Sequence, residues 1–410
     1  MLKTKDSVLV LRVSRLGRIP PALFSTELIQ ESGLPTVVVE FGNLKESKKI
    51  VKETLKKIRI DAPWARLLPQ KLQFPAILLW VILRLSSLFL TQGRPRILVA
   101  HGIAEQFVAW VLAKLFWIPF VIHAHEIYNS DDVKGPTSQF LLRMEKTIFR
   151  SAAFSIFPEK KRAQIYRERY EFTGPVFIAA NSPRFTPIPK ARDLRKAYQL
   201  NPNSIIMGYL GGIGPTNLLE IAIQALSFNP SVVFLAWGWG EREYLDQLNA
   251  LAHCLGVSER FIHLGQLMDG KLETLAGCDF SYCVYQTSLL RAKHEATASN
   301  KFFEAMAAGI PSLISSNPDF YQFNKKYPVG VCASSLTTEG VSAAMKTLVE
   351  NETLRKNLGK KARQVFETKF HYENQFFKPT QAYQDLYHGY PEIWSFNEVY
   401  LPPEELARAA

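Results

Sequence analysis

Cysteine and long apolar runs are both scarce in this 410-residue sequence, and each scarcity excludes a class of protein. The four cysteines all lie in the second half, none forms a Cys-x-x-Cys pair, and no histidine accompanies them at the spacing of a zinc site. This usage favours reduced thiols over a fold held by disulfides or zinc. The first residues, MLKTKDSVLVLRVSRLG, combine a short apolar run with several charges. They therefore predict a first strand and not a signal peptide.

The most apolar stretch is the 17-residue run Phe74–Leu90, which contains Arg84 and is flanked by Lys71, Arg94 and Arg96. A spanning helix needs about 20 apolar residues, and a central arginine makes insertion costly. We therefore expect no transmembrane span here. Two interpretations remain, namely an interior helix of the first domain or a helix whose exposed face enters a membrane interface.

Positive charge is concentrated in the first part of the chain. Residues 1–185 hold 28 Lys and Arg against 15 Asp and Glu, a balance of +13, whereas residues 186–410 hold 21 against 22, a balance of −1. Such a basic region is either a solvated surface or an attractive one for anionic lipid, nucleic acid or a phosphorylated substrate. No recognisable nucleic-acid-binding motif accompanies it, so we expect no nucleic-acid partner.

The order of apolar patterns predicts an α/β fold with two Rossmann-like parallel-sheet domains facing a central cleft. Strand-like runs alternate with helical patterns almost throughout, and the length suits two domains. The three prolines of residues 181–193 mark the expected linker. We expect an N-terminal domain over 1–185, a second domain over 186–370, and a tail over 371–410, rich in aromatics, that packs back on the N-terminal domain. Strands are expected at Val8–Val13, Thr36–Glu40, Ile97–Ala100, Phe120–His123, Ala153–Phe157, Ile205–Leu210, Val232–Trp237, Phe261–Leu264, Phe280–Val284, Pro311–Ser315 and Gly330–Cys332.

The strongest motif is SNKFFEAMAAGIPSLIS, Ser299–Ser315. Ser299 and Asn300 precede an apolar helical pattern, so a capped helix begins here with free N–H groups and a positive dipole end. Lys301 adds a charge to the first turn, and Glu304 lies one turn further along. An ordinary capped helix would explain the pattern, but so would a phosphate at the helix start with a ribose hydroxyl on Glu304.

This segment resembles the donor-nucleotide motif of family 4 (group 1) glycosyltransferases, approximately N-K-x-x-E-x-M-A-x-G-x-P. Residues 235–267, which contain LAWGWGEREYL, are similar to the family's strand–Gly-x-Gly–helix unit, and residues 272–286 to the helix and strand that follow it. In the first half, residues 94–126, which contain ILVAHG and FVIHAHE, resemble the family's paired histidine-containing strands. The resemblance implies a GT-B fold, a nucleotide-sugar donor and retention of anomeric configuration.

The resemblance also implies roles for individual residues. Glu304 would hold the ribose hydroxyls of the donor, and Asn300 and Lys301 would cradle its diphosphate. His125 corresponds to the N-domain histidine that contacts the donor sugar, and Glu126 would orient its imidazole or meet the acceptor. Read without the family, a lone histidine at this position is more often a core residue, but His101, His123 and His125 lie at predicted strand ends that face one cleft, which favours a site.

Glycine residues predict a second phosphate contact. Gly211, Gly212 and Gly214 follow the strand Ile205–Leu210 and allow close backbone approach. The loop 14–21 is a further candidate for contact with acceptor or diphosphate.

Three features depart from the family pattern. The position eight residues before Glu304 is Ala296, while Glu295 is one position off. The basic residue common after the first C-domain strand is absent from GGIGPTN, so Arg291, Lys293 or Lys301 would neutralise the diphosphate. No Asp-x-Asp occurs, since Asp131 and Asp132 are adjacent, and the resemblance implies that no metal or other cofactor is needed.

The expected function is therefore transfer of a sugar from a nucleotide-sugar donor to a glycan or lipid-linked acceptor in cell-surface polysaccharide or glycolipid synthesis. The protein would be cytoplasmic and peripheral on the inner face of an anionic membrane. A GT-B nucleotide-sugar epimerase and a non-catalytic binding partner for sugar nucleotides or membranes remain as alternatives.

Overall fold

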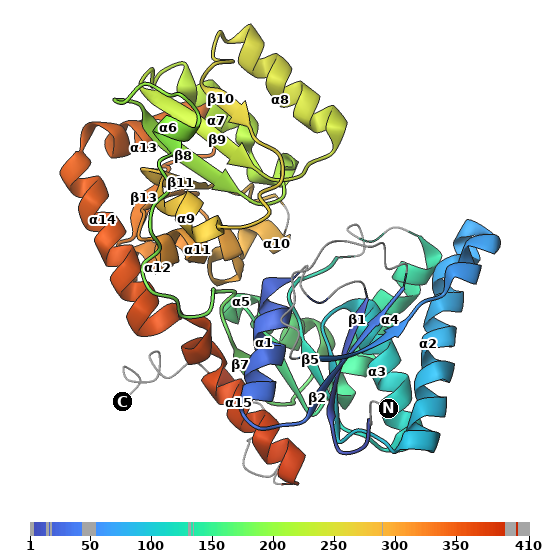
Figure 1. The fold of residues 1–410 in the computed structure, drawn as a ribbon. Coiled ribbons are helices and arrows are strands. Elements are labelled where there is room, and N and C mark those ends of the chain that lie inside the picture. The colour runs from blue at the N-terminus through green and yellow to red at the C-terminus, as the bar shows by residue number, and fades with distance from the viewer. Residues whose placement is uncertain are drawn as a thin grey trace. The chain divides into compact units, whose positions relative to one another are not determined.

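The structure is a computed structural model, and it describes residues 4–13, 16, 19–42, 55–129, 133, 135–288, 290–389 and 399–400 (Figure 1). All structural statements below concern these residues. The loop 14–21 proposed to meet acceptor or diphosphate lies largely outside them, and so do Asp131 and Asp132.

Contacts divide the chain into two compact units. The N-terminal unit combines Met1–Asn181 with Tyr372–Ala410, and the C-terminal unit is Ser182–His371. The first division falls at the start of the proline-containing segment 181–193.

The N-terminal unit is built on a parallel sheet with the strand order β14-β7-β6-β5-β4-β1-β2-β3. Its central strands are fully buried because their residues are almost all apolar, as expected for a parallel sheet covered on both faces. Its strands are β1 (Val8–Val13), β2 (Thr36–Phe41), β3 (Lys56–Ile60), β4 (Ile97–Ala100), β5 (Phe120–His123), β6 (Phe154–Phe157), β7 (Val176–Ile178) and β14 (Val399–Tyr400). Its helices are α1 (Pro20–Glu31), η2 (Pro63–Leu67), α2 (Gln70–Gln92), α3 (Ile103–Phe116), α4 (Pro136–Ser151), α5 (Lys160–Tyr170) and α15 (Tyr372–His388).

The C-terminal unit repeats the plan with the order β10-β9-β8-β11-β12-β13. Its strands are β8 (Ile205–Leu210), β9 (Val232–Trp237), β10 (Phe261–His263), β11 (Phe280–Cys283), β12 (Ser312–Ile314) and β13 (Gly330–Cys332). Its helices are α6 (Leu194–Ala197), η4 (Pro215–Asn217), α7 (Leu219–Leu226), α8 (Arg242–Cys254), α9 (Lys271–Ala276), α10 (Leu290–Lys293), η5 (Ala296–Ala298), α11 (Asn300–Ala308), α12 (Pro318–Lys326), α13 (Thr338–Glu350), α14 (Glu352–Val365) and the π-helical turn η6 (Phe366–Phe370). Two parallel-sheet α/β domains are therefore present, and the predicted fold class is confirmed.

Several elements have no counterpart in the sequence-based prediction, because their sequences carry little of the expected pattern. Strand β3, with the sequence KKIRI, is a charged edge strand, and charge is typical of protected sheet edges. Helix α5 is rich in charged residues and buries Ala163, Tyr166 and Tyr170. It begins at a cap in which the Glu159 side chain accepts a hydrogen bond from the backbone N–H of Arg162.

Helix α15 belongs to the N-terminal unit although it follows the C-terminal unit in sequence. It packs on α1, and the Tyr372 hydroxyl donates a hydrogen bond of 3.2 Å to the Pro21 carbonyl. Tyr372, Phe376 and Tyr383 are completely buried. The aromatic residues of this segment thus form part of the core of the N-terminal unit.

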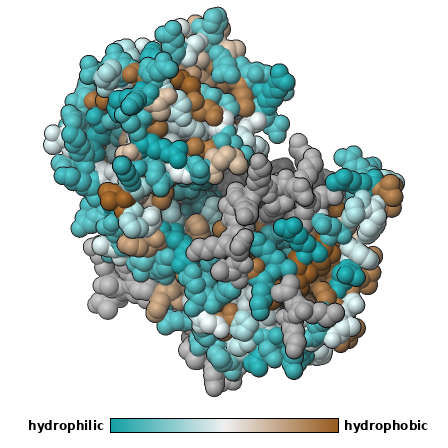
Figure 2. Space-filling view, viewed as in Figure 1, coloured by the Kyte–Doolittle hydropathy of each residue, from teal (hydrophilic) through white to brown (hydrophobic). Residues whose placement is uncertain are grey.

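Helix α2 is longer than the apolar run that marks it and is not an interior helix. Among the described residues it is the helix that is long and apolar enough to cross a membrane, by length and composition alone. Only 28% of its most apolar window is buried. It packs on α3 and η2, and apolar residues, brown in Figure 2, appear along the outer side of this unit over the position of α2.

Candidate functional site

Counted within its own unit, each sheet contains the strand order 3-2-1-4-5-6, which the N-terminal sheet extends with β7 and β14, and this order indicates where a ligand can bind. The order reverses between β1 and β4 in the N-terminal unit and between β8 and β11 in the C-terminal unit. In such sheets ligands bind beyond the carboxyl ends of the strands at this switch point. In the C-terminal unit the predicted site residues follow β8 and β11, whereas in the N-terminal unit His125 and Glu126 follow β5, the neighbour of β4. Each unit is described separately below.

In the C-terminal unit, helix α11 begins as the sequence predicts. The Ser299 side chain accepts a hydrogen bond of 3.2 Å from the backbone N–H of Phe302, so Ser299 is the N-cap. The Tyr285 hydroxyl, beyond the end of β11, lies 2.7 Å from the Ser299 hydroxyl and fixes it. Asn300 is the first residue of the helix. The free N–H groups of this first turn are suited to an anion.

Lys301 is held at the switch point by aromatic rings and an amide. Its ammonium lies 5.2 and 5.1 Å from the ring centres of Tyr209 and Tyr285, and it donates a hydrogen bond of 3.2 Å to Asn217 Oδ1. Burial alone would lower the pKa of Lys301, but the Tyr209 and Tyr285 phenol groups and the Glu295 carboxylate raise it above its ordinary value. The group is therefore a fixed positive charge.

The glycine turn after β8 lies against this lysine. Gly211 has a φ of +151°, and a Cβ placed on it would come within 3.0 Å of Lys301 Cδ. A Cβ on Gly212 or Gly214 would meet nothing within 4 Å. Gly211 is thus required by close packing, while the backbone of Gly212 and Gly214 is open to a ligand. The structure brings these three glycines and Lys301 together.

Glu304 is paired with a residue that the sequence analysis missed. Its Oε1 lies 3.3 Å from the ammonium of Lys271, the first residue of α9, and Glu304 is 8% exposed. No sequence signal links two residues 33 positions apart. Lys293 is exposed at the end of α10, and the Arg291 side chain lies outside the described part of the structure.

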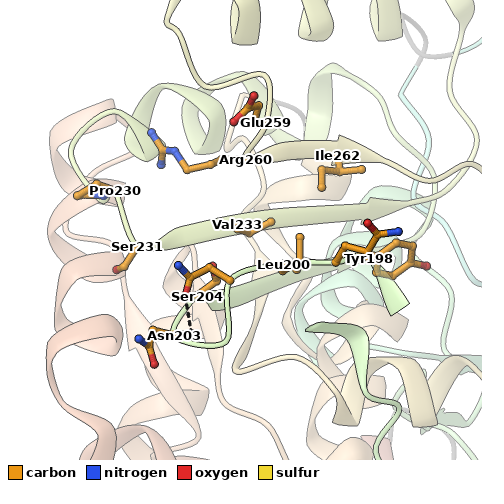
Figure 3. Close-up of a pocket in the computed structure, with 12 residues that line it drawn as sticks. Tyr198, Leu200, Asn203, Ser204, Pro230, Ser231, Val233, Glu259, Arg260 and Ile262 are labelled. Carbon is orange, nitrogen blue, oxygen red and sulfur yellow. Dashed lines mark hydrogen bonds between the residues drawn. The ribbon is translucent and has the colours of Figure 1, made fainter. Parts of the chain in front are cut away.

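A separate cavity of about 700 Å³ lies at the opposite edge of this sheet (Figure 3). Ser204, Ser231 and Arg260, which line it, each directly precede a strand. The cavity is therefore at the amino ends of β8, β9 and β10, away from Lys301 and the glycine turn. We do not assign it to the donor site.

In the N-terminal unit, three histidines meet at the carboxyl ends of β4 and β5. His101 follows β4, His123 ends β5, and His125 lies two residues later. The strands are neighbours in the sheet, and the ring centres are 4.3 to 5.2 Å apart. All three residues are buried.

His101 and His125 form a hydrogen-bonded pair of neutral rings. His101 Nδ1 and His125 Nε2 are 2.9 Å apart, and the ring planes differ by 13°. Burial, and then the neighbouring His123, lowers the pKa of both. Because both rings are neutral, one donates and the other accepts. The two outer nitrogens, His101 Nε2 and His125 Nδ1, therefore have opposite roles, one a donor and one an acceptor.

Glu126 does not orient the His125 imidazole, contrary to one of the two roles considered for it. Among the described residues, His125 Nε2 bonds to His101 and His125 Nδ1 has no partner. The Glu126 carboxylate is half-exposed and lies 3.9 Å from the Arg162 guanidinium, which also donates a hydrogen bond of 2.8 Å to the His125 carbonyl. The Glu126 side chain remains a candidate for acceptor contact.

A cavity of about 90 Å³ opens beside the histidine pair. Its polar lining includes Arg12, His101, His125, Glu126 and Glu145. Burial raises the pKa of Glu145 to about 7. The cavity thus offers hydrogen-bond donors and acceptors to a hydroxyl-bearing ligand, with both histidines lining it.

The three histidines also have the ligand type of a metal site. One ring nitrogen from each lies within 4.8 Å of the others. Two tetrahedral zinc ligands at 2.0–2.1 Å from the metal would be about 3.3 Å apart. The 2.9 Å between His101 Nδ1 and His125 Nε2 instead suits a hydrogen bond. The arrangement favours the neutral pair over a metal centre.

Replacement of His123 by Leu is expected to leave the free energy of unfolding at pH 7.5 unchanged or higher. Both ring nitrogens of His123 are buried without a hydrogen-bond partner among the described residues, so the native state loses nothing polar. Burial also lowers the folded-state pKa to about 3 from 6.5. The unfolded chain therefore gains a proton as pH falls below 6.5, and by pH 5.5 this destabilises the native state by about 1.4 kcal/mol.

Urea unfolding at pH 7.5, 6.5 and 5.5 measures this effect. His123→Leu should lose less stability on acidification than the wild type, whereas the exposed His388→Gln should not differ from it. An equal loss in all three proteins would show that His123 is protonated in the folded state.

Part of the chain matches a known protein family. Residues 190–365 match the family described as glycosyl transferases group 1. No curated protein matches the chain in sequence. Among solved structures, sucrose-phosphate synthase from Thermosynechococcus elongatus is similar with a TM-score of 0.74 and 14% identity, covering 94% of this chain and 100% of that one.

Two further structures are similar at comparable levels. Anabaena Alr3699/HepE in complex with UDP-glucose has a TM-score of 0.70 and 15% identity, with 92% of this chain and 99% of that chain covered. WaaG, a glycosyltransferase involved in lipopolysaccharide biosynthesis, has a TM-score of 0.66 and 15% identity, covering 91% and 98%. The chain therefore has the GT-B fold, and most of its C-terminal unit, residues 190–365, matches the group 1 glycosyl transferase family.

Proposed function

We propose that this protein transfers a sugar, with retention of anomeric configuration, from a nucleoside-diphosphate sugar to a glycan or lipid-linked acceptor. The observation that carries the proposal is the fixed charge of Lys301 beside the open backbone of Gly212 and Gly214 at the start of α11. A diphosphate is the ligand that matches a cation, free N–H groups and a helix dipole at one point. The solved complexes of HepE with UDP and UDP-glucose add weight to this donor class.

In the proposed reaction the anomeric carbon–oxygen bond to the diphosphate breaks, and a bond to the acceptor oxygen forms on the same face of the sugar. The proton of the acceptor hydroxyl passes to the departing diphosphate oxygen. Negative charge grows on the leaving diphosphate, so Lys301 and the α11 dipole stabilise the transition state electrostatically. His125 would contact the donor sugar from the N-terminal unit. No metal is required in this scheme, since Lys301 supplies the positive charge.

The charge of the N-terminal half supports a proposal for the acceptor and the location. Residues 1–185 carry +13 and residues 186–410 carry −1. We propose a lipid-linked or glycan acceptor of a cell-surface polysaccharide or glycolipid pathway. The enzyme would act in the cytoplasm, peripherally on an anionic inner membrane face.

A thermal-shift panel of UDP-, GDP- and ADP-sugars tests the donor assignment. A true donor at 100 times its dissociation constant adds about 2.7 kcal/mol of stability. The panel is repeated with EDTA, which should not change the shift. Release of nucleoside diphosphate that requires an acceptor supports transfer. Release without acceptor, with a changed sugar, indicates an epimerase, and donor binding without any turnover indicates a non-catalytic partner.

Glu304→Gln is expected to reduce donor affinity or turnover by about tenfold or more, the loss of one charged hydrogen-bond partner of the ribose. Lys271 would also lose its partner, because its ammonium is 3.3 Å from Glu304. Isothermal titration with the donor found in the panel measures the change, and Glu350→Gln, on the exposed face of α13, is the matched control. Normal donor affinity and turnover in Glu304→Gln would remove Glu304 from the nucleotide site.

A further inference from the structure

Helix α2 has two apolar faces, and one of them is exposed. Its buried face is formed by Ile77, Leu78, Val81, Leu85 and Phe89, which pack toward the N-terminal unit. At 100° per residue these side chains lie within one half of the helix surface. The fold therefore uses this face as an ordinary core contact.

The opposite face carries four leucines at helical spacing. Leu72, Leu79, Leu83 and Leu90 recur after seven, four and seven residues, which aligns them in one narrow stripe. Each is more than half exposed, and Leu90 is 78% exposed. A surface helix normally has a polar outer face. The fold of the N-terminal unit gives no reason for this stripe.

Neighbouring elements extend the stripe with tryptophan and leucine. In η2, Leu67 is 88% exposed, and the ring centre of Trp64 is 5.9 Å from that of Trp80 on α2. At the other end, Leu115 and Trp117 close α3 and are also exposed, with Trp117 at 87%. We call the docking face these eight residues: Trp64, Leu67, Leu72, Leu79, Leu83, Leu90, Leu115 and Trp117.

Contacts keep the end of α3 beside the end of α2. The rings of Phe89 and Phe116 are 5.3 Å apart, and the Arg94 guanidinium donates a hydrogen bond of 2.9 Å to the Phe116 carbonyl. These contacts place η2 and the end of α3 next to α2 within one unit.

The exposed charges on η2, α2, α3 and the segment after α2 are all positive, although the exposed Asp61 directly precedes η2 and Asp6 is paired with Arg96 at 3.2 Å. From Ala62 to Ala104 the sequence contains no Asp or Glu. Glu105 follows, but it is buried in an ion pair of 2.9 Å with Arg12. The exposed cations on η2, α2, α3 and the segment after α2 are Arg66, Lys71, Arg84, Arg94, Arg96 and Lys114. Arg84 folds over the Trp80 ring at 5.6 Å, so its charged end lies beside the stripe and not within it.

We propose that the docking face binds the surface of an anionic lipid bilayer, with α2 lying in the plane of the interface. Leucines would enter the acyl boundary, tryptophans would sit at headgroup level, and the surrounding cations would meet lipid phosphates. The 23 residues of α2 form a rod about 35 Å long. A spanning orientation is disfavoured because it would strip the five buried side chains from the core of the unit. An acidic protein partner would match the cations but would leave the leucine stripe unexplained.

This inference rests on the proposed function in one respect, the use of a membrane-bound acceptor. Attachment through α2 would hold the N-terminal unit, with its histidine cavity, at the membrane surface.

Sedimentation of the full chain with vesicles tests the proposal. The vesicles are phosphatidylcholine alone and phosphatidylcholine with about 30% phosphatidylglycerol. We expect binding to the anionic vesicles that falls at least about tenfold between 0.1 and 1 M salt. The double variant Leu79→Gln/Leu83→Gln should reduce the partition coefficient at least about tenfold, because two buried leucine contacts with lipid are lost. Phe228→Gln/Leu255→Gln, on exposed sites of the C-terminal unit, should bind as the wild type does.

Quenching of tryptophan fluorescence by lipids brominated along the acyl chain reports the orientation. Quenching should be strongest from positions near the headgroup and should weaken in Trp117→Phe. Uniform quenching at all depths would indicate a spanning helix and overturn the in-plane assignment. Unchanged vesicle binding in Leu79→Gln/Leu83→Gln would overturn the proposal. So would self-association in solution that this variant abolishes, because the docking face would then bind a second copy of the chain.

Two control measurements separate this proposal from the proposed function. The leucine variant should give the same thermal shift with the donor as the wild type, since its changes are in the other unit. If no sugar nucleotide binds while vesicle binding follows the expected pattern, the donor assignment fails and the docking face stands.

Discussion

Lys301→Met is expected to lower kcat by about 10²–10³-fold while the protein remains folded. The ammonium lies between the rings of Tyr209 and Tyr285, where it meets the charge that grows on a leaving diphosphate. Removing one preorganised group of this kind from an active site typically has an effect of that size. Methionine keeps most of the length of the side chain and the part that lies against Gly211, so packing should survive.

Steady-state kinetics with the donor identified in the panel measure this effect, together with donor affinity by titration. Lys356→Met, on the exposed surface of α14, is the matched control and should retain wild-type kcat. A fall in stability without a fall in kcat would mean that Lys301 is a structural cation held by two tyrosines.

His125→Ala should lower transfer at least about a hundredfold and leave nucleotide affinity unchanged, the size of a positioning or general acid–base effect. The ring opens to the cavity lined by Arg12 and Glu145 and is held by His101. The nucleotide contacts proposed above all lie in the C-terminal unit, so a change in the histidine pair should not reach them.

His125→Asn and His101→Asn refine this result. If the hydrogen bond between the two rings positions His125, His101→Asn should lower kcat less than His125→Ala does and should leave KM near its wild-type value. Circular dichroism and thermal unfolding guard against misfolding. A folded His125→Ala enzyme with full activity would remove His125 from the site, and an unfolded one would assign it to the core.

The fold class was accessible from sequence because the central strands are long, apolar runs bounded by polar turns. Strands β1, β8 and β9 lie at the predicted residues, since apolar runs of this length bounded by turn residues are typical of buried parallel strands. Strand β3 was missed because it is charged, and helix α5 was missed because its buried residues Ala163, Tyr166 and Tyr170 stand among seven polar or charged ones. A charged edge strand and a loop have the same composition.

The candidate site was likewise predictable from the sequence only in part. Lys301, Glu304 and the glycine turn were found because they are consecutive in motifs whose local geometry follows from a helix start and a tight turn. Lys271, which pairs with Glu304, was missed because it comes from another helix. The bond between His101 and His125 likewise depends on β4 and β5 being neighbours with a particular register. Their residue types were visible in the sequence, but the direction of each ring was not.

The two-part make-up of the N-terminal unit has a consequence for synthesis on the ribosome. Helix α15 contributes Tyr372, Phe376 and Tyr383 to a core whose remaining strands, apart from β14, are translated before residue 182. That core stays incomplete until the whole intervening unit has emerged, whereas Ser182–His371 is a single continuous segment that can fold as it is made. Residues 182–371 should therefore become protease-resistant first. On a ribosome stalled before Tyr372, the incomplete N-terminal unit should expose apolar surface to which chaperones bind.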